Sequence, residues 1–105
     1  MRLSKELREE IVKRIIEAVK PKKIILFGSY AYGEPTKYSD IDLLIVEENV
    51  ESKIKEKIKI RKSLENIKIS KDILVVSEGE YEFYKNDFGS VIKEACDKGA
   101  ELWSI

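Results

Sequence analysis

The segment that most constrains this chain places a glycine-serine pair and two aspartates between apolar runs. Gly28 and Ser29 follow Ile24–Phe27, and ten residues later Asp40 and Asp42 open a second apolar run. These runs predict two buried strands. Because side chains alternate along a strand, Asp40 and Asp42 should share one face, roughly 6–7 Å apart. Carboxylates in such a setting need a partner or a metal ion.

The glycine-serine pair adds a second kind of chemistry. A glycine and a hydroxyl at a strand-to-helix turn leave backbone N–H groups free to hold a phosphate. The spacing of Asp40 and Asp42 also lets two carboxylates share a pair of divalent ions, which lie ~3.5–4 Å apart in two-metal sites. Asp72, at the start of another apolar run, is the candidate third carboxylate. Together these residues predict a magnesium-nucleotide site.

Composition limits the alternatives. A chain of 105 residues predicts a single domain, residues 1–105. Charged residues make up 38% of it but the net charge is zero, so no strong general attraction to nucleic acid or membrane is expected. The sequence shows no bilayer-length apolar run and no signal peptide, and we expect a cytoplasmic protein.

The chain lacks histidine and glutamine and has one cysteine, Cys96. That excludes zinc-finger sites, histidine-based triads and an intrachain disulfide. Any metal must be bound by oxygen, which favours magnesium, manganese or calcium. We expect Cys96 to be a small buried hydrophobe.

Helices and strands are expected to alternate along the chain, which predicts an α+β (α/β-like) fold with helices covering one sheet. The region 51–67 is ambiguous, because its lysines and isoleucines alternate like a strand. Its length and helix formers favour a helix with Val50, Ile54 and Ile58 on one face and Ile60, Leu64 and Ile67 on another. The expected helices cover residues 4–20, 29–33, 51–67, 77–84 and 91–97, and the expected strands cover 22–27, 40–46, 71–76 and 102–103.

The motifs resemble a known family. Phe-Gly-Ser-Tyr-Ala-Tyr-Gly-Glu at 27–34, Ser-Asp-Ile-Asp-Leu-Leu-Ile-Val at 39–46 and Lys-Asp-Ile-Leu at 71–74 resemble the signature of the polymerase-beta-type nucleotidyltransferase superfamily. Within it, the chain is similar over nearly its whole length to the minimal nucleotidyltransferase (MNT) proteins, which include antitoxins of the MntA type.

The resemblance implies a small mixed sheet backed by helices and a metal-dependent nucleotidyltransferase. Asp40 and Asp42 would bind the metals that hold the nucleoside triphosphate, and Asp72 would bind the catalytic metal. Gly28 and Ser29 would hold the β and γ phosphates. Two Mg²⁺ ions are expected, with Mn²⁺ as an alternative.

The resemblance also implies a partner. Several minimal members are antitoxins that transfer AMP from ATP to a tyrosine of a HEPN-domain ribonuclease toxin. We therefore expect ATP or another NTP as donor, a HEPN-domain toxin as acceptor and a hetero-oligomer, since the chain looks too short to hold a separate acceptor-binding domain. The alternatives are a non-catalytic toxin-binding subunit, or transfer to a small molecule or an RNA end.

One position departs from the family pattern. Many relatives carry arginine where Tyr32 stands, and an arginine offers phosphate a cationic fork that tyrosine lacks. Lys37 or Arg61 could compensate.

Two clusters have a functional and a structural interpretation. The lysine-rich stretch 53–62 fits a solvated helix face better than a nucleic-acid surface, since glutamates interrupt it. The aromatic residues Tyr81, Phe83, Tyr84 and Phe88 could form a partner surface or part of the core, and the sequence favours neither.

Overall fold

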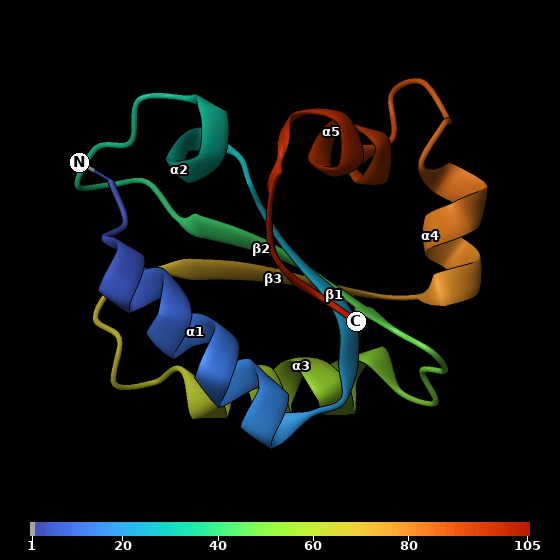
Figure 1. The fold of residues 1–105 in the computed structure, drawn as a ribbon, viewed down its shortest axis with the longest axis horizontal. Coiled ribbons are helices and arrows are strands. Elements are labelled where there is room, and N and C mark those ends of the chain that lie inside the picture. The colour runs from blue at the N-terminus through green and yellow to red at the C-terminus, as the bar shows by residue number, and fades with distance from the viewer. Residues whose placement is uncertain (1) are drawn as a thin grey trace.

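The computed structural model describes residues 2–105 and contains one four-stranded sheet with five helices (Figure 1). The strands lie in the order β3-β2-β1-β4. The elements, in chain order, are α1 (Lys5–Ala18), β1 (Pro21–Phe27), α2 (Ser29–Tyr32), β2 (Ile41–Glu47), α3 (Lys53–Ser63), β3 (Lys71–Ser77), α4 (Glu78–Tyr84), α5 (Val91–Lys98) and β4 (Ala100–Ser104).

The sheet is mixed. β2 and β3 run parallel, whereas β1 pairs antiparallel with both β2 and β4. Helices α1 and α3 cover one face, α4 and α5 cover the other, and α2 lies beside α5 at one end of the sheet (Figure 1). The α+β prediction is confirmed. None of the helices in residues 2–105 is long and apolar enough to span a membrane.

Both faces of the central strands are buried, which explains their uninterrupted apolar runs. Along β1, Ile24 and Leu26 pack toward α1 and α3, and Ile25 and Phe27 pack toward α4 and α5. Side chains two residues apart share a face, so β2 divides its residues in the same way. Alternation therefore decides which helix layer each residue of the central strands meets.

The helix starts follow the capping residues in the sequence. The Ser4 hydroxyl accepts a hydrogen bond from the Leu7 N–H, so α1 begins at Lys5. Ser77 and Glu80 form the predicted capping box at the start of α4. Gly99 follows α5 as expected and leads directly into β4.

The two apolar faces of α3 differ in burial, and one burial prediction is wrong. Ile54 and Ile58 on α3 are exposed, whereas Ile60 and Leu64 are buried, because only the C-terminal half of α3 carries its apolar side chains toward the sheet. Cys96 is exposed, although its Sγ accepts a hydrogen bond from the Tyr81 hydroxyl at 3.2 Å. Ile92 and Ala95 are the residues that α5 buries instead.

Glu47, at the far end of β2, is a buried carboxyl and should weaken the fold at high pH. Burial, and then the facing Glu56 carboxylate, raise the pKa of Glu47 from 4.5 to about 7. The folded state therefore holds this proton more tightly than the unfolded chain. Stability from Glu47 is complete at acid pH and is lost as the pH rises from about 4.5 to about 7.

We expect Glu47→Gln to raise the melting temperature above pH 7. The lowered pKa of Glu56 offsets part of the effect, so the gain should be on the order of 1 kcal/mol, or about 4–8 °C. Thermal melts at acid and alkaline pH test this, with the exposed neighbour Glu48→Gln as the control. Equal pH profiles for wild type and Glu47→Gln would contradict the assignment.

Candidate active site

The predicted site residues lie at one end of the sheet, on three adjacent strands. Gly28 and Ser29 leave β1, Asp42 is the second residue of β2, and Asp72 is the second residue of β3. The strand register pairs Phe27 with Asp42 and Asp42 with Asp72. The structure thus brings together residues from three separate stretches of the sequence.

Asp42 and Asp72 are direct neighbours on the same face. Parallel strands lie ~4.8 Å apart, and paired residues point to the same side. Leu44 and Leu74, two residues further along each strand, lie on the face covered by α4 and α5, so both aspartates point to that face. Asp40 is exposed and precedes β2, so its predicted strand position is wrong by one residue.

Asp72 is not held by the neighbouring lysine. The Lys71 ammonium donates instead to the backbone carbonyls of Ile67 and Ile69, at 2.5 and 2.7 Å. None of the ion pairs among residues 2–105 includes Asp72. Among the described residues, neither Lys71 nor Lys68 therefore forms an ion pair with Asp72.

Gly28 allows the Asp42 carboxylate to approach the turn. Its φ is +72°, a conformation that favours glycine. A Cβ at Gly28 would lie 2.0 Å from Asp42 Oδ2 and 3.0 Å from its Cγ. The turn is therefore built around the space that the carboxylate occupies.

We expect Gly28→Ala to damage this end of the sheet. The left-handed backbone alone costs an alanine roughly 1–2 kcal/mol, and the new methyl must also displace Asp42. Thermal melts should show a lower Tm, and nucleotide affinity should fall. Gly89→Ala is a matched control, because Gly89 also has a positive φ of 85° but open space around its Cβ position. If Gly28→Ala and Gly89→Ala lower the Tm equally, the contact with Asp42 adds nothing to stability.

The site concentrates negative charge. Burial, followed by the charges of Asp72, Asp40 and Glu94, raises the pKa of Asp42 from 3.8 to about 6. Among residues 2–105, no three histidine, cysteine, aspartate or glutamate side chains lie close enough together to hold a metal ion. The carboxylates nevertheless repel one another, and their oxygens are the donors that Mg²⁺ and Mn²⁺ prefer. The chemistry of this donor set fits a divalent ion.

Sequence reasoning missed one side of the site. Helix α5 brings Glu94 close to Asp42 and to the Tyr32 hydroxyl. The ammonium of Lys98, one turn later, lies 5.9 Å from the centre of the Tyr32 ring. Their spacing of four residues puts both side chains on one face of α5, which is the signal that could have grouped them.

The two cations considered as substitutes for the missing arginine lie elsewhere. Arg61 is on α3, which packs on the opposite face of the sheet, and it faces Lys71. Lys37 lies over the ring of its neighbour Tyr38, at 5.1 Å.

A comparison with protein families identifies the class. The profile of the "Nucleotidyltransferase domain" family matches residues 8–100, which is most of the chain. The chain therefore belongs to the nucleotidyltransferase domain family, a family of nucleotidyl-transferring enzymes. This confirms the family resemblance of its motifs.

Two proteins from Methanocaldococcus jannaschii are similar in sequence to parts of this chain. Both are provisionally named protein adenylyltransferases. One is 39% identical over 72 residues, which cover 67% of this chain and 72% of the relative. The other is 52% identical over 44 residues, which cover 36% of this chain and 44% of that relative's length.

Solved structures share the fold. A toxin–antitoxin complex with AMP-PNP matches with a TM-score of 0.70 at 21% identity, covering 93% of this chain and 73% of that chain. A complex of a tri-AMPylated Shewanella oneidensis HEPN toxin with an MNT antitoxin matches with a TM-score of 0.62 at 19% identity, covering 93% and 70%. At these identities the likeness concerns the fold.

Proposed function

We propose that this chain is a metal-dependent nucleotidyltransferase that transfers AMP from ATP to a tyrosine hydroxyl of a HEPN-type partner protein. One observation carries the proposal: Gly28 at the end of β1, Asp42 on β2 and Asp72 on β3 lie side by side at one end of the sheet. Both aspartates point to the face that α4 and α5 cover. The names of the two relatives and the protein complexes among the structural neighbours support a protein acceptor.

The reaction joins the tyrosine oxygen to the α-phosphorus of ATP. The bond from the α-phosphorus to its bridging oxygen breaks, pyrophosphate leaves, and the tyrosine proton is released. Asp40, Asp42 and Asp72 would hold two divalent ions, which would neutralise the phosphates and favour the ionised hydroxyl. Gly28 and Ser29 would hold the β and γ phosphates through backbone N–H groups and the Ser29 hydroxyl.

Nucleotide binding tests this assignment. The carboxylates and a triphosphate repel one another without a divalent ion. Burial, and then the charges of Asp72, Asp40 and Glu94, already raise the pKa of Asp42. Calorimetric titration with ATP should therefore show binding with magnesium and little binding in EDTA. Equal affinity under both conditions would overturn the metal-dependent assignment.

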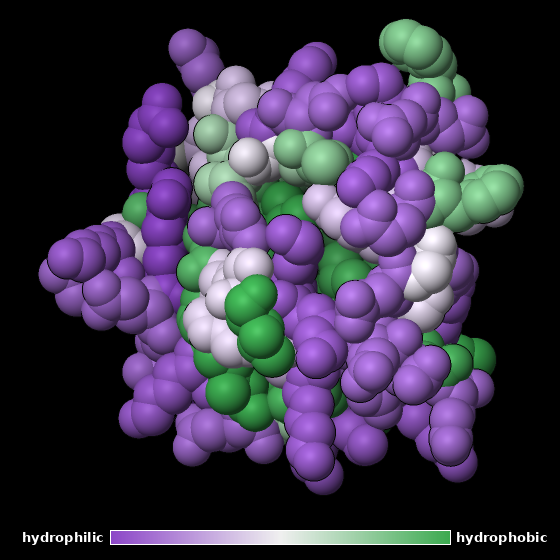
Figure 2. All heavy atoms as spheres, turned by 45° about the vertical axis from the view of Figure 1, so that its right-hand side comes forward, coloured by the Kyte–Doolittle hydropathy of each residue, from purple (hydrophilic) through white to green (hydrophobic). Residues whose placement is uncertain are grey.

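The aromatic cluster divides between core and surface. Tyr81 is buried against α5, whereas Phe83 is 75% exposed and Phe88 is 90% exposed. Figure 2, in which the α4 side comes forward, shows hydrophobic side chains that protrude from a mostly hydrophilic surface. Exposed aromatic side chains are typical of interface cores. We place the partner contact at Phe83 and Phe88.

Changing Phe83 and Phe88 to serine should weaken the complex. Loss of an aromatic anchor costs about 1–3 kcal/mol at an interface centre, so the dissociation constant should rise at least about tenfold. Size-exclusion chromatography and titration with a co-expressed HEPN-type partner protein test this. Ile54→Ser on α3, where Ile54 is 73% exposed on the opposite face, is the matched control. An unchanged complex would move the contact elsewhere.

A further inference from the structure

Helix α5 borders the candidate active site along its β1 side. Ala100 of β4 pairs with Leu26 of β1, and the two strands are antiparallel. Lys98 lies two residues before Ala100, and Gly28 lies two residues after Leu26, so both are at the same end of β1. The approach is tight, since a Cβ on Gly99 would lie 2.7 Å from Ile25 Cγ2 and 2.8 Å from the Leu26 carbonyl oxygen.

The residues of the site are arranged across the sheet in the order of its strands. Asp72 is on β3, Asp42 on β2, Gly28 at the end of β1, and Lys98 beyond β1 where β4 begins. Neighbouring strands are ~4.8 Å apart, so this line is long enough for an extended triphosphate. The β3 end carries only carboxylates, whereas the α5 end carries the Lys98 ammonium as well as the Glu94 carboxylate.

Among residues 2–105, Lys98 has no anionic partner within ion-pair distance. None of the ion pairs among residues 2–105 includes it, although Lys93 on the same helix pairs with Asp97. Its ammonium lies 5.9 Å from the centre of the Tyr32 ring, a cation–π distance that keeps it beside α2.

The side chain of Glu94 lies next to Tyr32, on the side of α5 that carries Lys98. The Tyr32 hydroxyl lies close enough to the Glu94 carboxylate to donate a hydrogen bond to it. The Tyr32 backbone N–H donates to the Gly28 carbonyl oxygen at 3.2 Å, so Tyr32 belongs to the same turn as Gly28. Tyr32 and Glu94 are thus positioning residues for the Lys98 ammonium.

We propose that Lys98 is the cationic residue that binds the β or γ phosphate of the nucleotide, and that the Tyr32 ring directs its ammonium to the turn at Gly28 and Ser29. This inference rests on the proposed function. It assigns the polarity of the bound nucleotide: the α phosphate lies between Asp42 and Asp72, and the terminal phosphates point to α5.

Calorimetry with magnesium-ATP and with magnesium and inorganic triphosphate tests the inference. Lys98→Met should weaken both ligands by about 10- to 100-fold, because a charge-assisted hydrogen bond to a phosphate is lost. Lys98→Arg should stay within about threefold of wild type, since it keeps the charge and the reach. Equal losses for the two ligands place the contact on the polyphosphate.

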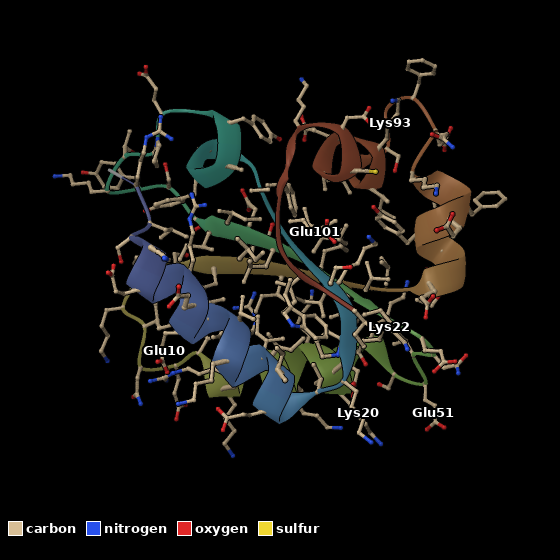
Figure 3. All side chains as sticks on the ribbon, in the orientation of Figure 1. Glu10, Lys20, Lys22, Glu51, Lys93 and Glu101 are labelled. Carbon is tan, nitrogen blue, oxygen red and sulfur yellow. The ribbon has the colours of Figure 1, made fainter. Side chains whose placement is uncertain are left out.

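Lys93→Met is the matched control on the same helix. Lys93 lies toward the α4–α5 loop (Figure 3), where it pairs with Asp97, and five residues separate it from Lys98. It therefore points to a different side of α5. The change removes the same charge and should alter ATP affinity by less than about twofold. Thermal melts of all three variants should match the wild type, which separates a lost contact from a lost fold.

The outcomes are distinct. If wild type binds magnesium-ATP and Lys98→Met binds it equally well, the role of Lys98 is overturned and the proposed function stands. If Lys98→Met and Lys93→Met lose affinity equally, general charge rather than a contact is responsible, and the inference also fails. If wild type does not bind magnesium-ATP, the proposed function fails, and the inference fails with it.

Discussion

Asp42→Asn is expected to abolish AMP transfer and to weaken magnesium-ATP binding at the same time. Asp42 touches the turn at Gly28 and adjoins Asp72, so it stands between the turn that we propose for phosphate binding and the third carboxylate that we propose for metal binding. Its loss removes a ligand that both divalent ions would share. Transfer should fall by at least about a thousandfold, or roughly 4 kcal/mol of transition-state stabilisation.

The same variant should fold better without metal. Burial and three neighbouring carboxylates hold the pKa of Asp42 at about 6, so its ionisation opposes folding at neutral pH. Because Asp42 is only half-buried, the gain should be on the order of 1 kcal/mol. Melts in EDTA and calorimetry with magnesium-ATP measure the two effects. Asp87→Asn, at an exposed loop aspartate, is the matched control. An Asp42→Asn protein that transfers AMP at the wild-type rate would refute the site.

Asp72→Asn should separate binding from chemistry. Asp72 lies on the edge strand β3, one strand further from Gly28 than Asp42 does. Nucleotide should therefore still bind through Asp40, Asp42 and the turn. Transfer should fall by about 10²- to 10⁴-fold, because activation of the tyrosine hydroxyl and stabilisation of the developing charge are both lost.

This variant also distinguishes two modes of action. If the chain acts on its partner by AMP transfer, Asp72→Asn should bind ATP and the partner but should no longer silence a toxin. If it acts as a toxin-binding subunit without catalysis, Asp72→Asn should protect as well as the wild type. The measurements are ATP affinity by titration, AMP incorporation by intact-mass spectrometry and growth of cells that express the partner. If Asp72→Asn transfers AMP near the wild-type rate, Asp72 has no role in catalysis.

Much of the site was readable from local sequence because strand geometry is simple. Alternation predicts that two acids separated by one residue point the same way, and the strand assignments put Asp42 and Asp72 at the starts of their strands. The parallel pairing that makes them neighbours follows from the long-range register of β2 with β3. Gly28 was readable as a turn, but its contact with Asp42 is a tertiary feature.

The contribution of α5 could not be read in this way. It depends on β4 returning to pair with β1, some 75 residues along the chain. No local pattern reports which turn of a helix such a pairing brings to a site, so Glu94 and Lys98 were missed. The exposure of Ile54 and Ile58 could not be predicted for a related reason, since helical periodicity shows that a face is apolar and does not show whether another element covers it.

AMP transfer itself tests the central claim most directly. The wild-type chain, magnesium-ATP and a HEPN-type partner protein that binds the chain would be incubated together, and the partner's mass would be measured intact. We predict that the partner gains the mass of one or more AMP groups on a tyrosine, and that EDTA or Asp42→Asn prevents the gain. A stable complex with no added mass under these conditions would contradict the assignment as a protein adenylyltransferase.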